Sequence, residues 1–392
     1  MLRGLSGFLP PRHHSPSMLL LIMVLLAMGG DRWLARLSLA GEGATQAAVS
    51  LEMVTEPPPE QTLPDFKPAQ LTFKASVQGK PLDSGRLSVD VTAPSTSMLR
   101  PTLLPAVEGT TLLQLSSELM SGKLAVEYLF PIPGVYTFDF DLAPAPDGQT
   151  IAPAKIRHSL HVQADPASVR RAWLFRAALF SLGAIAGVWY VCATHRQRTP
   201  PSRAVITPAV LVLGGLVFVT GRYTFADHGP RDLVFPKGAQ VIQGDDGWAL
   251  EVRPTPERAV VGELVEVGVM LTHQGQMFAD AMEVTIHLYN LKDDQTVLRT
   301  SILAPSGSTS QRFQVVESVP HTCTVTVRPV SGMSEGAMTL TAVVGIDAVA
   351  GPLPLAVRLQ VMGLVLGIVG AGAVGGFLLA SGVRKLPGRA GR

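Results

Sequence analysis

Cysteine is almost absent from this sequence, and its two copies are poorly placed to pair. Cys192 lies at the end of a long apolar run, whereas Cys323 lies in a polar segment. A disulfide framework needs cysteines that share one oxidising environment. We therefore expect no disulfide between them.

Charged residues are also scarce, at 16% of the chain, where a soluble protein has about 25%. The deficit is concentrated in four apolar stretches, and the segments between them are normally polar. The net charge is only +2, and no basic run with interleaved aromatic residues exists, which argues against nucleic acid as a partner. This profile is typical of a membrane protein with sizeable water-exposed domains.

Catalytic motifs are missing as well. There is no G-x-S-x-G sequence, and "GAGAVG" at 370–375 lies inside an apolar run with no acidic residue after it. Cys323 follows His321 by two residues on one strand face, where a buried core cysteine is favoured over a nucleophile. The centres of the apolar runs lack Asp, Glu, His and Lys, which disfavours an ion or proton pathway. We predict that the protein is not an enzyme.

The four apolar runs predict transmembrane helices at 18–38, 172–194, 204–226 and 361–383. The first has an apolar core of about 12 residues, which also suits a signal peptide, so both interpretations stay open. Trp173, Trp189 and Tyr190 lie near the ends of the second run, as interfacial aromatic residues do.

Basic residues mark one side of the membrane. The segments 1–17, 195–203 and 384–392 carry nine basic residues and no acidic one. The positive-inside rule makes these segments the cytoplasmic N-terminus, loop and tail. The two large domains then face the opposite side, and we predict a multi-pass protein of the bacterial inner membrane with both domains periplasmic.

The polar segments 47–166 and 245–359 predict β-sandwiches. Apolar residues alternate with polar ones along several stretches, for example at Tyr136, Phe138, Phe140 and Leu142. This period of two, with Gly and Pro at intervals of about 8–12 residues, is typical of antiparallel sandwiches.

The two halves of the chain also resemble each other. "VSLEMVTEPPPE" at Val49 parallels "WALEVRPTPERA" at Trp248, and "AQLTFKASVQGKPL" at Ala69 parallels "VEVGVMLTHQGQMF" at Val265. "PGVYTFDFDLAP" at Pro133 parallels "PHTCTVTVRPV" at Pro320. The predicted fold class is therefore a mixed membrane protein: four transmembrane α-helices plus two tandem all-β immunoglobulin-like sandwiches, related by internal duplication.

Glycines four residues apart in the apolar runs predict close helix packing. These pairs are Gly183 and Gly187, Gly363 and Gly367, and Gly372 and Gly376.

Two stretches of the first polar segment, "VQGKPLDSGRLSVDVTAPSTSM" (Val77–Met98) and "FPIPGVYTFDFDL" (Phe130–Leu142), resemble the YtkA-like family. "GELVEVGVMLTHQGQMFADAMEVTIHLY" (Gly262–Tyr289) is similar in its first part. That family of extracytoplasmic immunoglobulin-type sandwiches resembles the periplasmic part of FixH-type oxidase-assembly proteins. The resemblance implies a sandwich fold and a link to copper handling, although its Met-Pro-Met-His cluster is reduced here to Met98.

A copper site would need histidines that converge with soft methionine ligands. The candidates are Met98, His273 and Met277. We expect solvated or capped histidines instead, and no cofactor.

We therefore predict a non-enzymatic inner-membrane protein that presents two periplasmic domains for protein binding or for assembly of a membrane complex. Its expected partners are the lipid bilayer and other membrane or periplasmic subunits. The alternative is a membrane-anchored copper-delivery protein related to oxidase assembly.

Overall fold

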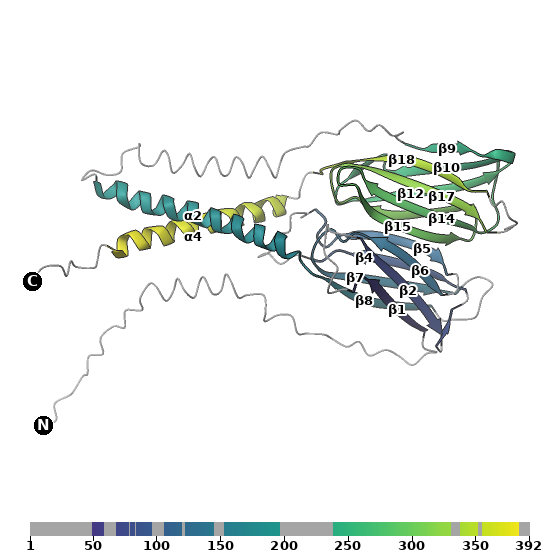
Figure 1. The fold of residues 1–392 in the computed structure, drawn as a ribbon, viewed down its shortest axis with the longest axis horizontal. Helices are drawn as coiled ribbons and strands as arrows, with labels where there is room; N and C mark the ends of the chain where they lie inside the picture. Colours follow the sequence, from purple (N-terminus) through teal and green to yellow (C-terminus); the bar gives the residue numbers. More distant parts are fainter. Residues whose placement is uncertain are drawn as a thin grey trace, which may run out of the picture.

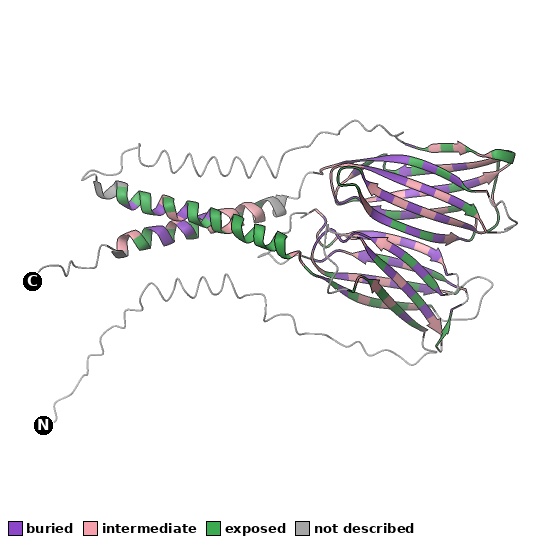
Figure 2. Ribbon diagram, viewed as in Figure 1, coloured by how far each residue is buried: buried purple, intermediate pink, exposed green. Residues whose placement is uncertain are grey.

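A computed structural model of the chain describes residues 49–58, 68–77, 79–82, 84–95, 106–119, 122–144, 153–196, 238–330, 338–351 and 355–383. The described residues form two β lobes with two long helices that project from the same side of them (Figure 1). Buried and exposed residues alternate along most strands, because one face of each strand packs on a core (Figure 2).

The first lobe holds eight strands in two layers. One layer pairs β1, β2 and β6, with β3 on β2, and the other has the order β5–β4–β7–β8. An aromatic core lies between them, where the rings of Phe73 and Phe140 are 5.1 Å apart. The strands are β1 (Val49–Glu56), β2 (Ala69–Val77), β3 (Lys80–Pro81), β4 (Arg86–Thr92), β5 (Thr111–Glu118), β6 (Lys123–Tyr128), β7 (Gly134–Ala143) and β8 (Ala154–Val162).

The second lobe repeats this layout with two additions. One layer has the order β9–β10–β12–β16, with β13 on β12, and the other has the order β15–β14–β17–β18, with β11 parallel to β18. The elements are β9 (Gln240–Gln243), the 3-10 helix η2 (Asp245–Gly247), β10 (Trp248–Thr255), β11 (Arg258–Val260), β12 (Leu264–His273), β13 (Gln276–Met277), β14 (Met282–Asn290), β15 (Gln295–Ala304), β16 (Ser308–Gln314), β17 (Pro320–Pro329) and β18 (Leu340–Val349).

The pairings of the first lobe recur strand for strand in the second. The pairs β1–β2, β2–β6, β4–β5, β4–β7 and β7–β8 have β10–β12, β12–β16, β14–β15, β14–β17 and β17–β18 as counterparts. The register recurs too: Leu51 lies opposite Ala75, and Leu250 lies opposite Leu271. Strands β9 and β11 are extra and lie at the outer edges of the second lobe.

Edge strands join the lobes. β6 pairs with β15, and β5 pairs with β16, so each layer of the first lobe continues into a layer of the second. All 18 strands therefore belong to one connected sheet. The prediction of two separate tandem sandwiches is corrected in this respect, because the edges that would end each sandwich are paired with each other.

The two helices are α2 (Pro166–Arg196) and α4 (Leu355–Val383). α2 follows β8 after residues 163–165, and its start is capped by the Asp165 carboxylate, which accepts a hydrogen bond of 3.0 Å from the Ala167 amide. Both helices begin several residues before the predicted spans 172–194 and 361–383. The prediction of four transmembrane helices is wrong: the described residues contain two long helices, and the ranges 18–38 and 204–226 lie outside them.

Candidate functional site

The helices α2 and α4 cross each other closely beside the lobes (Figure 1). Both run away from the lobes, so the pair is parallel. A Cβ atom built on Gly183 would lie under 3.0 Å from the backbone oxygen of Val369, and one on Gly376 would be as close to the oxygen of Ala184. The backbones touch here because glycine has no side chain to hold them apart.

The structure divides the predicted packing glycines into two groups. Gly183, Gly187, Gly372 and Gly376 all lie in the crossing, against backbone atoms of the other helix. Gly363 and Gly367 have nothing within 4 Å of a built Cβ and lie exposed on α4. The G-x-x-x-G spacing includes both groups, and only the tertiary structure shows which glycines meet the facing helix.

Apolar side chains cover the outside of the helix pair. Phe175 and Ile185 on α2 are 63% and 68% exposed, and Leu379 on α4 is 64% exposed. In the part of the chain that the structure describes, two helical stretches are long and apolar enough to span a membrane: Val169–Cys192, with a mean hydropathy of 1.6, and Leu359–Ser381, with 2.1. A pair of helices that is apolar on all sides is not covered by its own protein and needs another apolar environment.

The contact between the lobes is the second unusual feature, because it contains much of the buried polar structure. The side chain of Gln311 (1% exposed) on β16 bonds to the backbone of β5 as the peptide group of a neighbouring strand would. Its amide nitrogen donates to the backbone oxygen of Ser116 at 3.0 Å, and its oxygen accepts from the Ser116 amide at 2.8 Å. Neighbouring strands are thereby joined by side chains as well as by their backbones.

Three further buried side chains strengthen this lobe contact. Gln314 on β16 donates to the Thr110 hydroxyl at 3.1 Å, and Thr300 on β15 donates to the Ala125 oxygen at 3.2 Å. The Ser117 hydroxyl on β5 accepts from the Leu303 amide at 3.0 Å. Each is nearly inaccessible to water, so these buried polar groups are paired across the lobe contact.

Sequence reasoning did not identify these interface residues. A signal existed at Gln311, which precedes Phe313 by two residues and therefore shares the inward phase of that core residue. A glutamine at a core position of a strand indicates that its amide has a buried partner.

The structure describes two of the three predicted metal candidates. His273 and Met277 lie at the β12–β13 hairpin, where the His273 ring stacks on Trp248 at 4.3 Å and Met277 is 56% exposed. Met98 lies outside the described residues. Within the described part of the chain, no group of three or more His, Cys, Asp or Glu side chains is placed to hold a metal ion. The copper-delivery alternative stays a prediction.

Cys323 and His321 are core residues of β17. Burial raises the pKa of the Cys323 thiol to about 12, so it is protonated at neutral pH and a poor nucleophile. Burial lowers the pKa of His321 to about 4, although its Nδ1–H donates to the Val319 oxygen at 2.8 Å. These two side chains stabilise the fold in their neutral forms.

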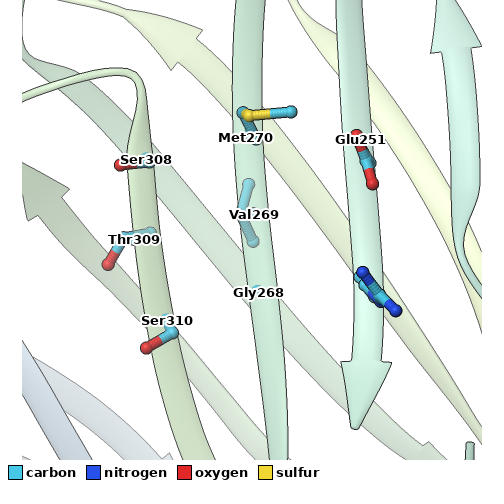
Figure 3. A pocket seen from close by; sticks show the side chains of 8 residues that line it. Glu251, Gly268, Val269, Met270, Ser308, Thr309 and Ser310 are labelled. Carbon is cyan, nitrogen blue, oxygen red and sulfur yellow. The ribbon is translucent and has the colours of Figure 1, made fainter. Parts of the chain in front are cut away.

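A shallow depression of about 400 Å³ lies on the outer face of β10, β12 and β16 (Figure 3). Its floor is Gly268, which has no side chain, and Met270, Glu251 and Ser310 stand around it. Neither histidine nor cysteine lines it. The depression lies where Gly268 leaves space among the side chains of the surrounding strands.

Comparisons with known proteins leave the family open. Neither a protein-family model nor a curated protein matches the chain. Among solved structures, the native conformation of the E. coli alpha-2-macroglobulin matches with a TM-score of 0.21 and 10% identity, over 79% of this chain and 14% of that one. The Salmonella alpha-2-macroglobulin reacted with methylamine matches with 0.21 and 9%, over 79% and 16%. The chain thus spans about a sixth or less of their length.

Proposed function

We propose that this protein is a non-enzymatic membrane anchor that presents its two joined lobes for the binding of other subunits of a membrane complex. The observation that carries the proposal is the helix pair. Its helices are apolar on all sides, with their large side chains exposed, and they meet through glycines. A lipid bilayer supplies the apolar surroundings that the lobes do not provide.

The direction of the helices supports one orientation. Both run away from the lobes, and each is followed in the sequence by a basic segment, at 195–203 and 384–392. The positive-inside rule then places the far end of the pair in the cytoplasm and both lobes on the opposite side. In a bacterium this is the inner membrane with periplasmic lobes.

The lobes support binding rather than catalysis. Their exposed surfaces are polar sheet faces, and the buried cysteine and histidine of β17 are neutral core groups. Rigid sheets that continue from lobe to lobe present a broad fixed surface, which suits the docking of protein subunits.

Labelling of single cysteines tests the orientation. In a C192A/C323A background, Ser50→Cys on the exposed part of β1 should react with a membrane-impermeant maleimide in intact spheroplasts. Ser202→Cys in the basic segment should react only after the membrane is permeabilised. The reverse pattern would show that the lobes are cytoplasmic.

Purification from native membranes tests the binding function. The tagged protein, extracted in mild detergent, should co-purify with at least one other membrane or periplasmic subunit in a fixed ratio. A Gln311→Ala variant, in which the lobe contact is weakened, should lose part of this subunit. Elution of the native protein alone, as a monomer, would contradict the proposal.

A further inference from the structure

The outer edge of the first lobe differs from its counterpart in the second lobe. β10 pairs on one side with β12 and on the other with β9, in the register Ala249 to Gln243 through Val252 to Gln240. β1, the counterpart of β10, pairs with β2, and its other side has no strand among the described residues. An unpaired edge of this length is a template for another strand.

The backbone of β1 presents suitable groups on this side. The Ala75 amide donates to Gly122 at 2.8 Å, and the Ala75 oxygen accepts from Leu82 at 3.0 Å, so both groups of Ala75 point away from β1. Leu51, which lies opposite Ala75, must then direct its own amide and carbonyl outward. Met53, two residues later, does the same.

The side chain of His158 on β8 contacts this edge. The His158 Nε2–H on β8 donates to the Leu51 oxygen at 3.2 Å. Phe138 of β7 and Val325 of β17 are equivalent when Pro133 is aligned with Pro320. His158 lies opposite Phe138, and Ala342 of β18 lies opposite Val325, so Ala342 is the counterpart of His158. β9 packs against β18. The β10 edge, which pairs with β9, thus has the small Ala342 at this position. The β1 edge has His158, which bonds the Leu51 carbonyl.

The sequence before β1 is a poor strand former. β9 has the sequence Gln-Val-Ile-Gln, with Ile242 packed against the core. The residues at the equivalent distance before β1 are Gly41, Glu42, Gly43 and Ala44, which lie outside the described residues. Glycine, glutamate and alanine are all depleted in strands.

We propose that β1 is a docking edge for an extended segment of another polypeptide, which adds to it as an antiparallel strand. The segment carries an aliphatic residue opposite Leu51, as Ile242 lies opposite Leu250. On docking, the His158 ring leaves the Leu51 carbonyl, and the backbone of the incoming strand replaces it. The inference rests on the proposed binding function and names the form in which a partner binds.

A peptide with the sequence of residues 238–245, Gly-Ala-Gln-Val-Ile-Gln-Gly-Asp, serves as the probe. We expect it to bind the full-length protein in detergent, measured by fluorescence anisotropy. N-methylation at Ile242, whose amide faces the docking edge, should weaken binding roughly tenfold or more, because one hydrogen bond is lost and the methyl group blocks approach. N-methylation at Val241, whose amide points away, is the matched control and should leave binding unchanged.

Hydrogen exchange locates the bound peptide, and His158→Ala tests the mechanism. The peptide should slow exchange of the Leu51 and Met53 amides but not of Leu250 and Val252, which β9 already covers. His158→Ala, which recreates the alanine of the second lobe, should tighten binding roughly threefold to tenfold.

Three results would overturn the inference. The first is an equal effect of both N-methyl groups on binding, and the second is protection of amides elsewhere than in β1. The third is protection of the Leu51 and Met53 amides in the full chain without peptide, which would mean that the chain fills its own edge. Co-purification of a subunit would still support the proposed function in each case, so the two ideas fail separately.

Discussion

Gln311 and Ser116 lie 195 residues apart in the sequence, yet the side chain of one satisfies both backbone groups of the other. This contact shows that the two lobes form one folded unit rather than two independent domains joined by a linker. It also makes the lobe contact testable by removal of one amide.

Gln311→Ala should destabilise the protein by about 2–4 kcal/mol, because the buried amide and carbonyl of Ser116 would both lose a partner. The measurement is the denaturant midpoint of unfolding, followed by circular dichroism in detergent. Gln243→Ala, at an exposed glutamine of β9, is the control and should change stability by less than about 0.5 kcal/mol. Equal effects of the two substitutions would mean that the Gln311 contact contributes nothing specific.

Gly187→Val and Gly372→Val should each separate α2 from α4, because a side chain at either position would overlap the facing backbone. Overpacking of this kind costs about 1–3 kcal/mol. Spin labels at the exposed positions Ile185 and Leu379 would report the helix distance by electron paramagnetic resonance. Gly363→Val and Gly367→Val, which meet nothing within 4 Å, should leave that distance unchanged. A change as large in these controls would contradict the observed crossing.

Tyr136→Phe should destabilise the first lobe by about 1–3 kcal/mol. The Tyr136 hydroxyl donates to the Ile132 oxygen and accepts from the Ile132 amide at 3.1 Å, in a fully buried site. Phenylalanine keeps the ring and removes both hydrogen bonds, so the loss is polar rather than a cavity. Thermal unfolding measures it, and Phe138→Leu shows the different effect of lost ring packing.

Acidification should weaken the second lobe through His321. The folded-state pKa of about 4 lies below the ordinary value of 6.5, so the unfolded chain binds more protons between these values. Stability is complete above pH 6.5 and falls as the pH drops toward 4, by at most about 3 kcal/mol. His321→Asn, whose amide can keep the bond to Val319, should flatten this part of the stability profile. An unchanged slope would show that another group causes the dependence.

Local patterns predicted the strands well, because the inward phase of residues such as Val265 and Val267 depends on burial of one sheet face. The stretches aligned at Val49 with Trp248, and at Ala69 with Val265, occupy equivalent positions in the observed pairings. Common ancestry of the lobes stays a prediction, as does the resemblance to the YtkA-like family.

The lobe contact could not be predicted in the same way. Pairing of β6 with β15 joins residues about 170 positions apart, for example Tyr128 with Leu298, and neither strand carries a local mark of its partner. The glycine spacing likewise could not choose between Gly363 and Gly372. That choice depends on where α2 and α4 meet in the tertiary structure.

The attachment of the helices to different lobes has a mechanical consequence. α2 follows β8, the last strand of the first lobe, and α4 follows β18, the last strand of the second, and the lobes are fixed to each other through β5, β6, β15 and β16. A shift of one lobe against the other would therefore move the start of one helix relative to the other. The contact between the lobes is thus coupled to the angle at which α2 and α4 cross.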